Sequence, residues 1–267
     1  RLESFKLAGI LISAPIGSLI AYYIGLRQTM LFVMFPVILA FLIILTLKEP
    51  KIKKKTHENY LKILKEGVKF FGKQKAIKIL TFDMISIATV AYFMIWFYQL
   101  LLQKVNIDVK YFGFVHATFV LAQILIVNNY KFLEKIFRSK KNFILFSGLI
   151  TGLFFIIAGI TKNLVLVLIS IILGGGFGLS RRPLFISYLN KYIPSEKRAT
   201  VLSTVSMFRR IVLVIINPII GFFVDINLNY TLIFLGSLGI IFTLASKVEE
   251  EHLIDFLHNF YTIDFYL

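Results

Sequence analysis

One acidic side chain inside a long apolar segment is the first residue of this sequence that could carry chemistry. A charge at the centre of a membrane-spanning helix costs about 2.5 to 3.5 kcal/mol on insertion scales, so each such residue is a candidate functional group. Asp83 is the only acidic residue clearly inside an apolar run, close to Lys78. It is a possible proton site, and the other interpretations are a structural ion pair or a side chain that reaches the cytoplasmic surface.

Four arginines also lie inside apolar segments, and anion binding is the chemistry they could perform. Arg181 and Arg182 could hold an anionic substrate or a lipid headgroup, or reach the cytoplasm. Arg210 lies about 18 Å along a hydrocarbon core of roughly 30 Å, so it should face water or a polar partner. It shares an arc of about 60° with Ser203, Ser206 and Asn217. The side chain of its neighbour Arg209 is expected to pack against another helix or to face lipid.

The apolar segment that contains Asp83 and the segment after it carry polar and aromatic side chains at helical spacing. The segment 77–103 has a stripe on the face opposite Asp83, made of Thr89, Tyr92, Trp96, Gln99 and Gln103. On the following segment, Gln123 shares a face with His116. Such stripes are typical of a water-accessible cavity or of an aromatic packing seam.

The sequence shows no residue pattern typical of catalysis or of metal binding. It has no cysteine, and its four histidines show no metal-ligand spacing. No pair of acidic residues and no Ser–His arrangement occurs at one depth, so we expect neither an enzyme nor a bound cofactor. The net charge of +16 would suggest nucleic-acid binding in a soluble protein. Here the positions of the charges predict membrane topology instead, with no nucleic-acid partner.

Composition identifies the solvent of this chain as lipid. Apolar residues make up 58% and charged residues only 16%, and the mean hydropathy is +0.81. A soluble fold has about 25% charged residues and could not bury this much apolar surface. Runs long enough to cross a bilayer predict an all-α integral membrane protein with about eight transmembrane helices at 7–25, 29–47, 77–103, 111–129, 142–161, 164–190, 199–224 and 228–246.

The distribution of Lys and Arg predicts the orientation. One face of the predicted bundle carries 22 of these residues and the other carries 4. Since cytoplasmic loops carry the excess, both termini should lie in the cytoplasm of a multi-pass protein of the cell membrane. The basic loop 48–76 contains an amphipathic stretch that suits either an anionic leaflet or a solvated linker, with a shared apolar face of Tyr60, Leu61, Leu64, Val68 and Phe71.

Two segments resemble the major facilitator superfamily of transporters, in particular its prokaryotic, drug-efflux-like group. The stretch from Asn190 to Ser203, Asn-Lys-Tyr-Ile-Pro-Ser-Glu-Lys-Arg-Ala-Thr-Val-Leu-Ser, is similar to the family's turn between its tenth and eleventh helices. Tyr98-Gln99, followed by Tyr111-Phe112-Gly113, resembles the link from its seventh to its eighth helix. A weak internal repeat aligns Pro15 with Pro218.

The resemblance implies a chain that runs from the fifth to the twelfth helix and lacks the first four. Residues 1–47 would then be the end of the N-terminal half, 48–76 a cytoplasmic loop, 77–246 the C-terminal six-helix half and 247–267 a tail. The segment Ser13–Ser18 keeps the proline and small residues of the family's antiporter signature but lacks its doubled glycines.

The function implied is secondary transport of small solutes, with proton-coupled, drug-like efflux as one form. Nutrient or metabolite uptake and a non-transporting membrane fragment are the alternatives. The expected partners are a small-molecule solute and membrane lipids, and the completed protein is expected to be a monomer. The resemblance places a substrate cavity at the central stripes, lined by Tyr92, Trp96, Gln99, Gln123, Arg182, Ser206, Arg210 and Asn217.

Overall fold

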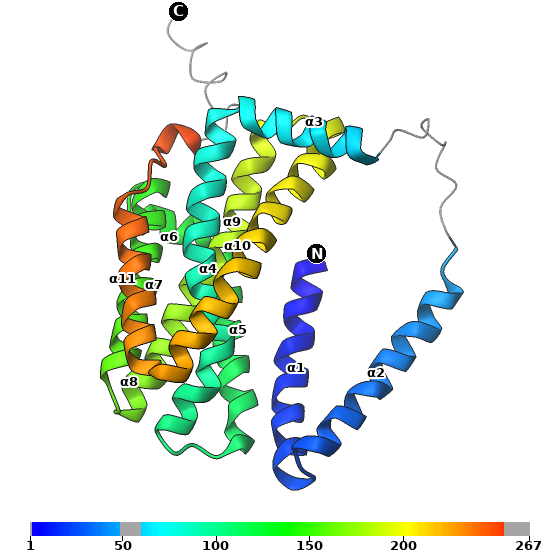
Figure 1. The fold of residues 1–267 in the computed structure, drawn as a ribbon, viewed down its shortest axis with the longest axis vertical. Coiled ribbons are helices and arrows are strands. Elements are labelled where there is room, and N and C mark those ends of the chain that lie inside the picture. Colours follow the sequence, from blue (N-terminus) through cyan, green and yellow to red (C-terminus); the bar gives the residue numbers. More distant parts are fainter. Residues whose placement is uncertain (1, 49–59, 254–267) are drawn as a thin grey trace, which may run out of the picture.

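The computed structural model describes residues 2–48 and 60–253, and all of its regular elements are helical. Most of the tail 247–267 lies outside these residues. The α-helices, shown in Figure 1, are α1 (Leu2–Tyr23), α2 (Leu26–Thr46), α3 (Tyr60–Lys73), α4 (Lys75–Lys104), α5 (Phe112–Asn128), α6 (Tyr130–Ile136), α7 (Lys140–Ile160), α8 (Leu164–Ile169), α9 (Gly175–Tyr192), α10 (Arg198–Ile226) and α11 (Leu228–Leu244).

Seven stretches of the described chain are helical, long enough and apolar enough to cross a membrane. One of them, Leu164–Tyr192, joins α8 to α9 through a π-helical turn at Ser170–Gly174. The eighth predicted span corresponds to α11, which is apolar but has only 17 residues. The all-α membrane architecture is therefore confirmed, with seven full-length spans where the sequence predicts about eight.

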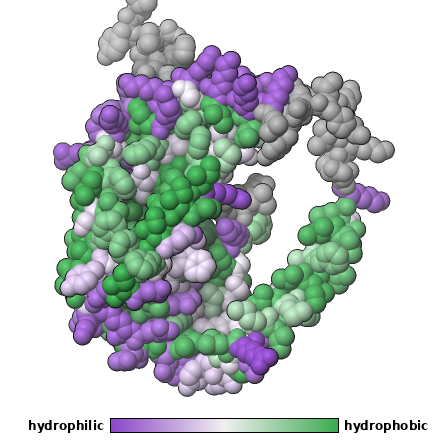
Figure 2. Space-filling model, viewed as in Figure 1, coloured by the Kyte–Doolittle hydropathy of each residue, from purple (hydrophilic) through white to green (hydrophobic). Residues whose placement is uncertain are grey.

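The helices α4, α5, α7, α9 and α11 form the packed bundle, and α4 supplies much of its core. Hydrophobic side chains form a band across this bundle, and hydrophilic ones gather at its two ends (Figure 2). Glycines allow α7 and α11 to touch through their backbones. A Cβ atom on Gly236 would lie 2.5 Å from the Gly152 carbonyl oxygen, and one on Gly152 would lie 2.6 Å from that of Gly236. Small residues at such a seam are how helices associate closely within a membrane.

Enlarging a glycine of this seam should destabilise the bundle. We expect Gly236→Leu to lower the free energy of unfolding by at least about 1 to 3 kcal/mol, the usual cost of overpacking. Thermal unfolding in detergent, followed by circular dichroism, measures the effect. Gly221→Leu is the matched control, because a Cβ at Gly221 in α10 meets nothing within 4 Å. Equal stability of the two variants would contradict the close α7–α11 contact.

The N-terminal helices lie at the side of this bundle (Figure 1). Helix α1 packs on α5, whereas α2 extends away from the bundle and has no buried residue. Both α1 and α10 contain a proline eight residues before their last residue, and each is followed by a short turn and another apolar helix. The two helices that carry the Pro15/Pro218 repeat therefore share this local arrangement.

The amphipathic helix α3 lies across the end of α10, as Figure 1 shows. Gly67 is buried against Thr200 and Thr204 of α10, and the Phe71 and Phe208 rings have centroids 5.0 Å apart. Of the apolar face expected from the sequence, Leu64 and Phe71 are half-buried and Val68 is exposed. The missing side chain of Gly67 lets the backbone of α3 approach α10.

Reporter fusions test the orientation of the bundle. A fusion after Lys73, at the end of α3, should report a cytoplasmic position, and one after Lys162, between α7 and α8, should report the outside. The physical reason is the asymmetry of 22 against 4 basic residues. Both reporters on the same side, or the Lys73 fusion outside, would contradict the topology.

Candidate functional site

Three arginines from two helices gather beside the aromatic stripe of α4. Arg209 of α10 is half-buried and lies close enough to Arg182 of α9, to Arg210 and to Tyr92 of α4 to interact with each electrostatically. Arg210 is exposed. The cationic cluster, defined as Arg182, Arg209 and Arg210, therefore concentrates positive charge within an apolar bundle.

Two members of the cationic cluster have no charge partner within the described chain. Arg209 and Arg210 make neither a hydrogen bond nor an ion pair with any residue of 2–48 or 60–253. Like charges that lie near one another repel, and Arg182 and Arg209 are both half-buried. The arrangement is therefore suited to hold an anion.

Arg209 corrects an expectation from the sequence. A helical wheel of α10 alone placed it outside the polar stripe, facing packing or lipid. In the structure Arg209 faces α4 and α9, because α10 presents to them the arc between its polar stripe and its buried face. Of the remaining stripe residues, Ser206 is half-buried, and Ser203 and Asn217 are exposed like Arg210.

The aromatic stripe of α4 continues from the cationic cluster. The rings of Tyr92 and Trp96 meet edge to face with centroids 6.2 Å apart, and the Trp96 side chain is 60% exposed. One turn further on, the Gln99 side-chain amide donates to the Tyr98 hydroxyl at 3.2 Å. That hydroxyl also lies 3.3 Å from Nδ1 of His116 on α5.

Tyr98 is a functional candidate that the stripe analysis missed. It is buried and lies off the stripe, but its hydroxyl joins α4 to α5 through Gln99 and His116. The only available signal was the adjacent polar pair in the sequence.

Gln123 is half-buried farther along α5, where its backbone nitrogen lies 3.6 Å from the Cβ position of Gly176. Gln123 therefore belongs neither to the cationic cluster nor to the group formed by Tyr98, Gln99 and His116.

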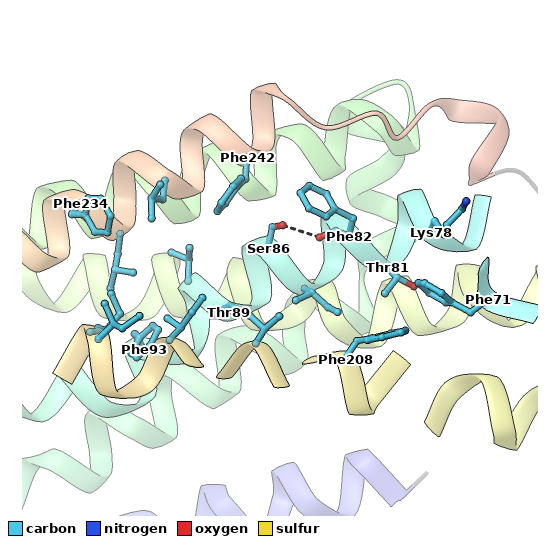
Figure 3. A pocket seen from close by; sticks show the side chains of 18 residues that line it. Phe71, Lys78, Thr81, Phe82, Ser86, Thr89, Phe93, Phe208, Phe234 and Phe242 are labelled. Carbon is cyan, nitrogen blue, oxygen red and sulfur yellow. Dashed lines mark hydrogen bonds between the residues drawn. The ribbon is translucent and has the colours of Figure 1, made fainter. Parts of the chain in front are cut away.

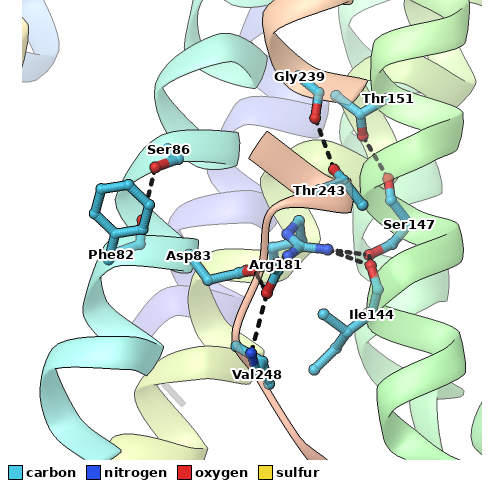
Figure 4. A network of polar contacts seen from close by, with 11 residues as sticks. Phe82, Asp83, Ser86, Ile144, Ser147, Thr151, Arg181, Gly239, Thr243 and Val248 are labelled. Atoms are coloured by element: carbon cyan, nitrogen blue, oxygen red, sulfur yellow. Dashed lines mark hydrogen bonds and ion pairs between the residues drawn. The ribbon is translucent and has the colours of Figure 1, made fainter. Parts of the chain in front are cut away.

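Asp83 lies in a buried ion pair with Arg181 (Figure 4). The two side chains are only 2% and 1% exposed, and Nη2 of Arg181 contacts Oδ1 of Asp83. The hydroxyl of Ser246, just after α11, donates to Oδ2 of Asp83 at 2.5 Å. Nη1 of Arg181 donates to the Ile144 carbonyl and to the Ser147 hydroxyl, at 2.5 and 2.6 Å, on α7.

This network joins four parts of the bundle around one charge pair. It includes α4, α7, α9 and the segment after α11, and the guanidinium also packs 5.1 Å from the centre of the Phe185 ring. Arg181 therefore neither reaches the cytoplasm nor joins its neighbour Arg182 in the cationic cluster. Both terminal nitrogens of the guanidinium are bonded to the adjacent helices, while its Nε has no hydrogen-bond partner within the described chain, and breaking the buried pair would be costly.

Comparison with known families agrees with the architecture. A model of the Major Facilitator Superfamily matches residues 79–252, which include the ion pair, the cationic cluster and the aromatic stripe. A search of curated proteins finds no match.

Proposed function

The chain belongs to the Major Facilitator Superfamily of membrane transporters, which are not enzymes, and we propose that it transports small amphipathic anions. The observation that supports this substrate class most strongly is the cationic cluster beside Tyr92. Secondary transporters bind solutes near the middle of the membrane, between bundles of helices. In support of this proposal, the cluster and the stripe are carried by α4, α9 and α10, three helices that are long and apolar enough to belong to membrane spans.

Both halves of the proposed solute have a counterpart in the protein. A guanidinium presents a planar fork of N–H groups that matches a carboxylate or a phosphate. The rings of Tyr92 and Trp96 offer an apolar surface next to it, and Trp96 is largely exposed. An aromatic carboxylate is the simplest molecule that uses both features.

Efflux is the direction we propose, because the segment from Asn190 to Ser203 resembles the drug-efflux-like group of the family. The contact between α1 and α5 describes the state of the path. The Ser18 hydroxyl lies 2.9 Å from the carbonyl oxygen of Lys110, and a Cβ on Gly113 would overlap the Ala14 carbonyl. This close seam lies at the end of the bundle that the charge distribution assigns to the outside. A path closed there is accessible from the cytoplasm, a state that exporters and importers both pass through.

Proton coupling through Asp83 would require its carboxylate to separate from Arg181 during each cycle. That step would leave a buried guanidinium without its counter-ion, which is costly. We therefore assign Asp83 a positioning role. We propose that any coupling ion binds to groups that are accessible to water.

Transport assays in vesicles of both orientations test the proposal. Vesicles prepared from cells that express the protein from its own gene are incubated with labelled naphthoate, and neutral naphthamide is the control. We expect saturable uptake of naphthoate alone, in everted vesicles only. Uptake in right-side-out vesicles only would indicate an uptake permease, and the lack of saturable uptake in both would indicate a non-transporting fragment.

A further inference from the structure

A long apolar groove separates α10 from α4 and α11 (Figure 3). It has a volume of about 680 Å³, and its walls are almost entirely hydrophobic. Phe71 and Lys78 lie at one end, and Phe93 and Phe234 lie at the other. The groove is distinct from the cationic cluster, because none of the three arginines lines it.

The groove is long enough to hold an extended aliphatic chain. From Lys78 to Phe93 it follows α4 for about 22 Å at 1.5 Å per residue. One leaflet accounts for about half of a hydrocarbon core of roughly 30 Å. An acyl chain that enters at Lys78 can therefore lie within the groove along its whole length.

Polar groups without partners mark where the ligand's polar end would lie. Thr81 and Thr89 line the groove, are 2% and 6% exposed, and have hydroxyl oxygens with no hydrogen bond within the described chain. A buried hydroxyl without a hydrogen-bond partner is unfavourable. Thr81 is one helical turn from the exposed Lys78. Thr89 lies about 12 Å deeper, where only a polar group in the ligand's tail or an ordered water could reach it.

The charge at the mouth of the groove favours an anionic headgroup. Helix α3 supplies Phe71 to the groove and exposes its lysines on the same end of the bundle, Lys62, Lys65, Lys69 and Lys73. Figure 2 shows hydrophilic side chains gathered over this end. Each basic residue near the surface adds to the attraction of an anionic leaflet.

We propose that this groove binds one acyl chain of an anionic phospholipid, with the phosphate held by Lys78 and Thr81. The bound chain fills the space beside α10, of whose 29 residues only Val201, Thr204, Val205 and Ile220 are buried. The lipid thereby fixes α10 relative to α4, and with it the position of the cationic cluster. This inference stands independently of the solute, because no arginine of the cationic cluster lines the groove.

Lipid binding to the purified chain tests the proposal directly. The protein in detergent is mixed with phosphatidylglycerol, with phosphatidylcholine or with oleate, and retained molecules are counted by native mass spectrometry. We expect one tightly retained phosphatidylglycerol per chain, and at least ten-fold weaker retention of phosphatidylcholine. Equal retention of the two phospholipids, or retention of oleate alone, would overturn the assignment.

Two matched pairs of variants locate the site. Val212→Trp fills the groove from α10 and should abolish retention, whereas Val214→Trp, at a side chain that is 72% exposed outside the groove, should not. Lys78→Gln should remove the preference for phosphatidylglycerol, and Lys75→Gln should keep it. A phosphatidylglycerol with a photoreactive acyl chain should crosslink to groove residues such as Phe82. Crosslinks confined to other helices, or variants that all retain the lipid, would refute the groove as the site.

Discussion

Replacing Arg181 with methionine should destabilise the bundle by about 3 to 5 kcal/mol, the range seen when one partner of a buried ion pair is removed. The variant leaves the Asp83 carboxylate buried beside Ser246 with no counter-ion. It also removes the donors that hold Ile144 and Ser147. Denaturant unfolding in detergent, monitored by the fluorescence of Trp96, measures the loss.

A double variant separates the charge effect from loss of volume. Asp83→Leu combined with Arg181→Met replaces the pair with apolar side chains, which is often neutral or stabilising relative to a buried pair. We expect it to recover most of the stability lost in Arg181→Met. If the single and double variants are equally unstable, the network stabilises by packing alone.

Asp83→Asn distinguishes a positioning role from a proton-carrying one. The amide keeps the shape of the carboxylate but gives Arg181 no charge partner, so the variant should unfold at a lower denaturant concentration. A variant that is as stable as the native protein and has lost only the pH dependence of transport would contradict the positioning role. It would restore Asp83 as a proton site.

Removing charge from the cationic cluster should produce the second large effect. We expect Arg209→Gln with Arg210→Gln to weaken naphthoate binding by about 10- to 100-fold. Each hydrogen bond to a charged group contributes about 1.5 to 3 kcal/mol, and part of that is retained by Arg182 and by the glutamine amides.

The only tryptophan of the chain makes this binding directly measurable. Trp96 is exposed and contacts Tyr92, which interacts electrostatically with Arg209, so a bound aromatic anion should quench its fluorescence. Arg27→Gln is the control, since Arg27 is exposed in α2, away from the cluster. Unchanged affinity in the double variant, or an equal loss in the control, would contradict anion binding at this cluster.

Helix positions were predictable from the sequence because each span needs an unbroken apolar length. The run 111–129 became α5, and the run 199–224 lies within α10. Only the shorter α11 departs from the expected number of spans. Local signals of this kind do not depend on which helices are neighbours.

Contacts between helices were not predictable from single-helix patterns. The pairing of Asp83 with Arg181 joins residues 98 positions apart, and depth along each span does not specify which helices face each other. Arg209 was misplaced for the same reason, since the wheel of α10 carries no information about α4 and α9. The contact of α3 with α10 depends on Gly67, whose role is visible only once Thr200 and Thr204 lie against it.

The reactivity of single cysteines along α10 tests the central claim, a water-accessible path with positive potential. The chain has no cysteine, so Ser206→Cys and Asn217→Cys report on the polar stripe, and Val212→Cys and Ile216→Cys report on the apolar groove. Each is treated in everted vesicles with an anionic and with a cationic thiol reagent of equal size. The proposed path predicts that stripe positions react faster than groove positions, that Ser206→Cys prefers the anionic reagent, and that naphthoate protects it. Equal labelling of stripe and groove, or a preference for the cationic reagent at Ser206→Cys, would contradict an anion path along this face of α10.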